Sequence, residues 1–195
     1  MSVIHRHSHE ADTATPATDN DRGPWFARAL ATLRIAFGIT FLWAFLDKAF
    51  ALGFHTGYDQ EGTLDRFGDA AWINGGSPTE GFLSFGVNPD SPFASFFNNL
   101  AGYAIVDWAF MLGLLAIGIT LTLGVGIRIG AIAGVAMYLF MYAAVMLPEN
   151  NPVFDDHLIG AISMVVLALT LAGDTWGLGK AWAKTHLVRQ YGILR

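Results

Sequence analysis

The sequence contains no cysteine among its 195 residues. This absence excludes disulfide bonds, thiolate metal sites, iron–sulfur clusters, covalently attached c-type haem and thiol-based redox chemistry. Charged residues are also scarce, at 14% of the chain against ~25% in a typical soluble domain. The net charge of −5 argues against nucleic acid as a partner, because nucleic-acid binding needs a basic footprint. Any redox chemistry must therefore use a diffusible carrier or the cofactor of a partner.

What the chain has in abundance is apolar sequence: 53% of its residues are hydrophobic, and its mean hydropathy is +0.44. A helix that crosses a bilayer needs ~20 apolar residues. Uncharged runs at 108–127 and 129–147 reach that length, and a shorter run covers 158–173. A further apolar segment near the N-terminus is interrupted by Arg34. We therefore expect an all-α membrane protein, a four-transmembrane-helix bundle with helices near 26–50, 104–126, 129–148 and 156–173.

Basic residues are distributed unequally between the two sides of this bundle. Nine of the eleven Lys and Arg residues fall on the side of the termini, and only Lys48 and Arg66 fall on the other. Cytoplasmic segments carry an excess of Lys and Arg, so this distribution predicts a multi-pass protein of the cell membrane with both termini cytoplasmic. The loop between the first two helices, residues 51–103, is then extracytoplasmic.

Three regions follow from this topology: a cytoplasmic N-terminal tail at 1–24, a membrane domain at 25–180 and a cytoplasmic C-terminal tail at 181–195. The first tail is polar and is expected to be disordered. Its alternating histidines, at positions 5, 7 and 9, have no carboxylate or cysteine shell. We interpret them as solvated and predict no metal site.

The outer loop is rich in aromatic residues, which argues against disorder. Ser77-Pro78-Thr79-Glu80 is a capping box with proline at the first helical position, and Ser91-Pro92 repeats the serine–proline start. These signals predict two short helices in an ordered cap. Within the bundle, Gly126, Gly130 and Gly134 recur every four residues, which favours close packing of the third helix against a neighbour.

Arg34 is an ionisable residue at membrane depth and is by default a functional candidate. It follows Arg28 by six residues, which places it roughly 9 Å deeper along a helix. Three interpretations are open for its side chain. It reaches back to lipid phosphates, pairs inside the bundle, or holds the head group of an anionic lipid or quinone.

A second polar cluster is expected where helices meet the outer surface. Lys48 ends the first helix, Asp107 opens the second, and His157 opens the fourth beside Asp156, which is suited to be the N-cap of that helix. Asp107 and His157 are the candidate catalytic residues, as proton carriers. The candidate quinone- or lipid-binding residues are Arg34, Trp43, Lys48, Trp108, Tyr138 and Tyr142. An aromatic belt at the membrane interface explains the same Trp and Tyr residues without a ligand.

Intrinsic haem is not expected, because a membrane b-type cytochrome needs paired histidines at depth and His157 is the one histidine near a span after the first helix. Binding of a diffusible quinone requires fewer specific residues than binding of haem. An apolar slot, an aromatic wall and a proton-carrying His or Asp at one end would be enough to bind it.

Several short motifs, taken in order, resemble the DoxX/DoxD-like membrane proteins. They are Leu33-Arg34 with Gly38, Phe41-Leu42 and Lys48; Gly75 to Leu83; Val106-Asp107-Trp108; Gly118 to Gly124 with Arg128; Asn151-Pro152 with His157; and Gly173 with Trp176-Gly177-Leu178. The resemblance covers about residues 28–180. It implies a four-helix membrane fold and kinship with the large subunit of thiosulfate:quinone oxidoreductase, which couples oxidation of thiosulfate to tetrathionate with quinone reduction. That enzyme has a small subunit, for which this chain shows no corresponding region.

Three functions remain open at this point. The first is a membrane redox subunit that reduces quinone with electrons from thiosulfate or another donor, with Lys48 attracting an anionic donor. The second is a non-catalytic accessory or scaffold subunit that anchors a redox or respiratory complex. The third is a small-solute transporter, which the absence of broken-helix repeats disfavours. The expected partners are membrane lipids and a small subunit or soluble redox protein, and a homo-oligomer is left open.

Overall fold

The computed structural model describes residues 23–58, 61–148, 151 and 153–195. Within these residues the protein is helical and has no strand, apart from an isolated bridge between Tyr58 and Leu64. The histidines at positions 5, 7 and 9 and nearly all of the predicted N-terminal tail lie outside the described residues. The first helix begins at Pro24, whose missing N–H and fixed φ suit the first helical position.

Four long helices occur where the apolar runs predict them: α1 (Pro24–Phe50), α3 (Ala104–Leu123), α4 (Ile127–Ala144) and α5 (Asp156–Leu169). Helices α1, α3 and α4 are long and apolar enough to cross a membrane. The fourth expected helix ends at Leu169 instead of 173, because Leu171 adopts a left-handed backbone with φ of 48°. At 14 residues, α5 is ~21 Å long, shorter than the ~30 Å hydrocarbon core.

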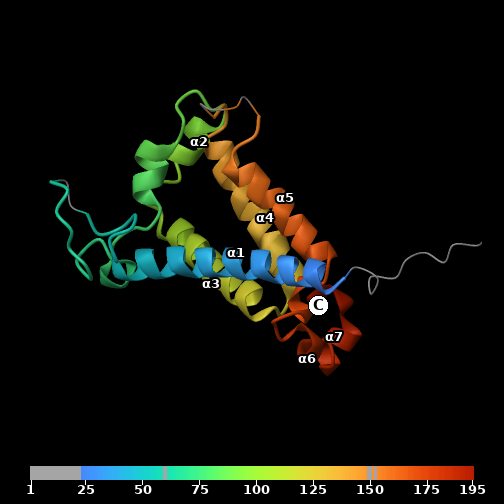
Figure 1. The fold of residues 1–195 in the computed structure, drawn as a ribbon. Helices are drawn as coiled ribbons and strands as arrows, with labels where there is room; N and C mark the ends of the chain where they lie inside the picture. Colours follow the sequence, from blue (N-terminus) through green and yellow to red (C-terminus); the bar gives the residue numbers. More distant parts are fainter. Residues whose placement is uncertain (1–22, 59–60, 149–150, 152) are drawn as a thin grey trace, which may run out of the picture.

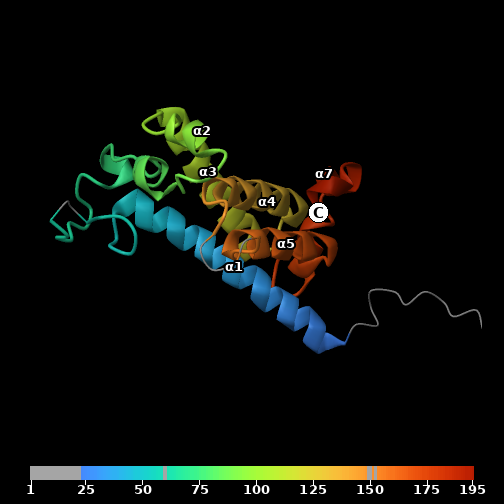
Figure 2. The same cartoon turned by 90° about the horizontal axis from the view of Figure 1, so that it is seen from above.

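The long helices pair as two arms. One arm is α1 against α3, and the other is α4 against α5 (Figures 1 and 2). Glycines permit the close approach within these pairs and between the arms. A Cβ on Gly118 of α3 would lie 2.7 Å from Leu42 Cγ, and one on Gly134 of α4 would lie 3.2 Å from Met164 Sδ. The predicted packing role of Gly134 is thus confirmed.

The two arms meet at one end and diverge toward the other, as Figure 1 shows. We call the end where they meet, with Pro24 and the C-terminus, the junction end. We call the opposite end the loop end. The main apolar core lies between the long helices and includes Phe41, Met111, Ile117, Leu121, Met164 and Leu167.

The segment between α1 and α3 forms a cap across the loop end, with short helices η2 (Trp72–Asn74), η3 (Phe82–Gly86) and α2 (Ala94–Asn98). A second apolar cluster packs this cap onto α4 through Leu83, Phe97 and Ala144. Asn88 and Ser91 anchor it further by donating to carbonyls at the end of α4. The two predicted short helices are present in this segment, although the first is a π-helix and the second begins at Ala94.

The C-terminal residues fold against the junction end as η4 (Ala172–Asp174), α6 (Gly179–Trp182), α7 (His186–Gln190) and η5 (Gly192–Leu194). Trp182 donates its indole N–H to the Leu194 carbonyl, and Arg195 pairs with Asp174 at 2.9 Å. Residues 181–195 are therefore packed onto the helices.

Candidate functional site

Arg34 is fully buried at the junction end and donates all five of its N–H groups to backbone carbonyls. Nε donates to Ala172 at 3.1 Å, and the two Nη atoms donate to four more carbonyls. Those four belong to Leu121, Thr122, Thr175 and Trp176. The guanidinium thus stabilises carbonyls at the end of α3 and in the segment after α5, where helix partners are missing.

Glycines make room for this cluster. Gly124 has φ of +73°, and a Cβ on it would lie 3.0 Å from an Arg34 Nη atom. A Cβ on Gly173 would lie 2.4 Å from the Gly124 carbonyl oxygen. Of the three interpretations of Arg34, the structure shows pairing inside the bundle, with carbonyls as partners. Burial rules out reaching lipid phosphates, and no N–H is left over for a ligand head group.

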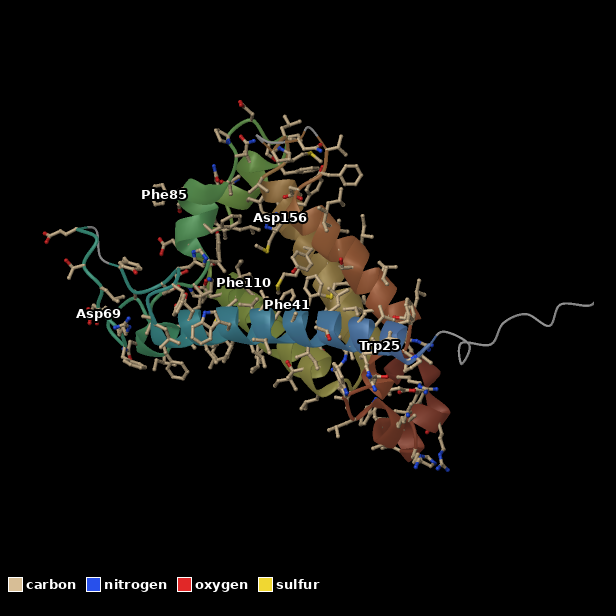
Figure 3. All side chains as sticks on the ribbon, in the orientation of Figure 1. Trp25, Phe41, Asp69, Phe85, Phe110 and Asp156 are labelled. Atoms are coloured by element: carbon tan, nitrogen blue, oxygen red, sulfur yellow. The ribbon has the colours of Figure 1, made fainter. Side chains whose placement is uncertain are left out.

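A cavity of about 1170 Å³ lies between α3 and α4 beneath the cap. Its wall is mainly apolar, with Phe82 and Phe97 from the cap, Phe110 and Ile117 from α3, and Met137 from α4. Phe110 lies in the angle between the two arms in Figure 3. The volume is slightly above the 300–1,000 Å³ that is usual for small-molecule pockets. This cavity is the best candidate for a ligand site.

Lys48 is the one Lys or Arg residue in the described wall of this cavity, and that described wall contains no Asp or Glu. The neighbouring acid, Asp47, is 2% exposed and accepts the backbone N–H groups of Phe54 and His55 at 3.0 Å each. Asp47 thereby folds the chain back over the end of α1. This fold places His55 in the wall of the cavity.

Asp107 lies just behind the cavity wall and is 7% exposed. Its Oδ1 accepts hydrogen bonds from the Ser77 hydroxyl at 2.8 Å, the Thr79 hydroxyl at 2.6 Å and the Thr79 N–H at 3.2 Å. Ser77 also accepts the Glu80 N–H, as the capping box predicts. Asp107 therefore fixes Ser77 and Thr79, two of the polar residues that line the cavity.

His157 belongs to a different cluster. Its Nδ1 lies 2.6 Å from Asp155, and its ring contacts Tyr138 edge-on at 6.3 Å between centroids. Asp155 also accepts the Leu158 N–H and is the N-cap of α5, one residue before the predicted Asp156. Burial raises the pKa of the Asp155 carboxyl, but the hydrogen bonds from His157 and Leu158 outweigh burial, so this pKa lies below its ordinary value.

The structure therefore does not bring Lys48, Asp107 and His157 together. No hydrogen bond or ion pair joins any two of them among the residues that the structure describes, and His157 does not line the cavity. The physical reason is that α4 lies between them: α3 and α4 enclose the cavity, and α5 packs on α4 elsewhere.

The aromatic candidates also lie outside the cavity wall. Trp43 and Trp108 are 42% and 54% exposed, each with one edge-on aromatic neighbour, Phe54 and Trp72 respectively. Tyr138 packs on Phe37 and Phe41 of α1. Tyr142 donates its hydroxyl to the Val153 carbonyl at 2.6 Å. Of the six predicted quinone- or lipid-binding residues, Lys48 alone lines the cavity.

Sequence reasoning missed most of the wall. Ser77 and Thr79 were visible as a capping box, yet that motif indicates a helix start and carries no sign of a ligand. Phe110 and Met137 look like ordinary apolar helix residues, and their role depends on the angle between the two arms. His55 had no motif around it at all.

Comparison of the chain with family models, curated proteins and solved structures finds no match.

Proposed function

We propose that this protein is an integral membrane redox subunit of DoxX/DoxD type that binds quinone in the cavity between α3 and α4. The observation that carries the proposal is the cavity itself, about 1170 Å³ in volume and mainly apolar, with Lys48, Ser77 and Thr79 in its wall near the cap. A quinone has an apolar body and two ring oxygens that accept hydrogen bonds. Such a ligand suits a pocket with few polar groups at one place.

In the proposed reaction, thiosulfate or another donor, directly or through a partner protein, supplies two electrons, and the quinone takes them up with two protons to become a quinol. Asp107 is the proposed proton carrier nearest the cavity, through the Ser77 and Thr79 hydroxyls that it holds. His157, oriented by Asp155, is proposed to exchange protons at the loop end outside the cavity. Lys48 provides positive charge that would attract an anionic donor.

The proposed topology has four crossings, by α1, α3, α4 and the shorter α5 extended by η4. Both termini lie in the cytoplasm and the cap lies outside. The distribution of basic residues supports this arrangement, and the common position of Pro24 and the C-terminus at the junction end agrees with an even number of crossings (Figure 1). Single-cysteine labelling is well suited to test it, because the natural chain has no cysteine. Cysteines placed at Asp90 and Lys184 should react with an impermeant reagent from opposite sides.

The test of function is thiosulfate-dependent quinone reduction in native membrane vesicles. A deletion strain is complemented with the wild type, Asp107→Asn, His157→Ala or Ala109→Trp. Ala109 lines the cavity, so a tryptophan there should fill it and raise the KM for quinone. Ala116 lies on the same helix, is exposed and does not line the cavity, so Ala116→Trp is the matched control.

Loss of activity in the deletion strain and in Ala109→Trp, with recovery in Ala116→Trp, would support quinone binding in this cavity. Unchanged activity in the deletion strain would refute the proposed reaction. Equal activities of Ala109→Trp and Ala116→Trp would refute the location.

A second candidate function, an accessory subunit that anchors a redox complex, is favoured by the outer face of the cap. Phe85 is 90% exposed and Phe96 is 53% exposed, and Figure 3 shows Phe85 directed away from the helices. Exposed aromatic groups of this kind favour contact with a partner protein. Under this alternative, Phe85→Ser should release a partner that is retained after mild solubilisation, while quinone reduction is absent from the purified protein.

A further inference from the structure

Lys48 has an unusual electrostatic position, which does not depend on quinone chemistry. It lies in the last turn of α1, half-buried, and makes no hydrogen bond or ion pair with any residue that the structure describes. The adjacent Asp47 carboxylate is directed to the N–H groups of Phe54 and His55. The ammonium group therefore has three N–H donors and no acceptor from the described protein.

The polar side chains in the described wall, those of His55, Thr56, Tyr58, Ser77 and Thr79, make no hydrogen bond with Lys48. Ser77 and Thr79 donate their hydroxyl hydrogens to Asp107, which lies behind the wall, and Ser77 also accepts the Glu80 N–H. The described wall contains no carboxylate. A cation beside an apolar surface is stabilised by an anionic hydrogen-bond acceptor, and an anionic ligand in the cavity would supply one in addition to the nearby Asp47 charge.

The rest of the wall fits an extended apolar chain. The α3 side of the cavity runs from Ile105 to Ile117, which is ~18 Å along the helix and more than half of the ~30 Å hydrocarbon core of a bilayer. Phe140 of α4 also belongs to the wall and is 60% exposed, so the wall continues onto the outer surface of the helices. A lipid tail in the surrounding bilayer could therefore reach the cavity from the side.

We propose that the cavity binds a single-chain lipid with an anionic oxygen head group, whose carboxylate or equivalent group accepts hydrogen bonds from Lys48 while its chain lies between α3 and α4. The inference concerns the same cavity as the proposed function but needs no redox activity. A long-chain carboxylate and a quinone would compete for this space.

The experiment measures binding of radiolabelled palmitate to the purified protein in nanodiscs. Lys48→Met keeps an apolar side chain of similar length and removes the charge, and Lys48→Arg keeps the charge. Lys184→Met removes an exposed charge at the junction end and is the control. We expect Lys48→Met to weaken palmitate binding about tenfold or more, since a hydrogen bond to a charged group is lost. Lys48→Arg should recover most of the affinity, and Lys184→Met should match the wild type.

Hexadecanol, which has the same chain and a neutral head, separates the head group from the chain. Its binding should change little in Lys48→Met, while Ala109→Trp should weaken both ligands. Equal palmitate affinity of the wild type and Lys48→Met, with both variants folded as judged by their melting temperature, would overturn the proposal. So would unchanged binding in Ala109→Trp.

The outcomes also separate this inference from the proposed function. Palmitate binding that depends on Lys48, in a protein without quinone reductase activity, would refute the redox proposal alone. Quinone reduction that is sensitive to Ala109→Trp, without palmitate binding, would refute the anionic-lipid proposal alone.

Discussion

Replacing Arg34 tests whether one buried guanidinium holds the two arms together. In Arg34→Met, five backbone carbonyls lose their partner. At ~1 kcal/mol for each net hydrogen bond, the loss is about 5 kcal/mol. Removing a buried charge returns part of its desolvation cost, and water reaches the helix ends, so we expect a net destabilisation of ~3 kcal/mol.

Arg34→Lys separates charge from geometry. A lysine ammonium keeps the positive charge but has three donors and no planar fork, so it can satisfy at most three of the five carbonyls. We expect an intermediate loss of ~1–2 kcal/mol. Arg28→Met is the matched control, because Arg28 lies on the same helix, is exposed and contacts the Trp25 ring at 5.1 Å.

The assay is thermal unfolding of the purified protein in one detergent, followed by tryptophan fluorescence. With ~2–4 °C of melting temperature per kcal/mol for a chain of this size, Arg34→Met should melt ~6–12 °C below the wild type. Arg28→Met should melt within ~2 °C of it. If Arg34→Met melts with the control, or if Arg34→Lys and Arg34→Met melt together, the five-carbonyl explanation is wrong.

Three further predictions concern the cap and the helix ends. Asp107→Ala should lower stability by ~2 kcal/mol, because three hydrogen bonds to Oδ1 are lost. Asp107→Asn should be less destabilising, because its side-chain oxygen can still accept hydrogen bonds. Equal melting temperatures of the two variants would contradict this explanation. Asp155→Ala should cost ~1 kcal/mol through the lost N-cap. Folding lowers the pKa of the Asp155 carboxyl, so its stabilising effect is present above the unfolded-state pKa and is lost as the pH falls through the folded-state pKa. The difference in stability between Asp155→Ala and the wild type should therefore shrink in acid and not at alkaline pH. Gly173→Ala should lower the melting temperature, because its Cβ would lie 2.4 Å from the Gly124 oxygen, whereas Gly192→Ala, with no atom within 4 Å of its Cβ, should not.

Local sequence signals predicted the helices well and their ends less well. The long apolar runs marked α1, α3, α4 and α5 within a few residues, since hydrophobic length is a property of each segment alone. The serine–proline starts at Ser77 and Ser91 marked the two short helices of the cap. The prediction of the last turn of the fourth helix was wrong, because Leu171 adopts a left-handed backbone where the chain folds around Arg34. No local sequence pattern indicates that contact.

The candidate site was predicted only in part. Lys48 and Asp107 were predicted to belong to one polar cluster at the outer ends of the helices, and they lie at the cavity and just behind its wall, respectively. His157 was assigned to the same cluster because its helix starts at the same end of the bundle. Starting at the same end of the bundle fixes how far along the helices a residue lies. It does not fix on which side of α4 that residue lies.

The amino-acid sequence by itself determined that this protein is helical, apolar and free of cysteine chemistry, and that a long aromatic segment joins its first two long helices. Each of these properties follows from composition or from residues close together in the chain. Only the tertiary structure decided what Arg34 binds, because its carbonyl partners lie 87 to 142 residues away in the sequence. The same holds for the cavity, whose shape depends on the angle at which two helical arms diverge from that arginine.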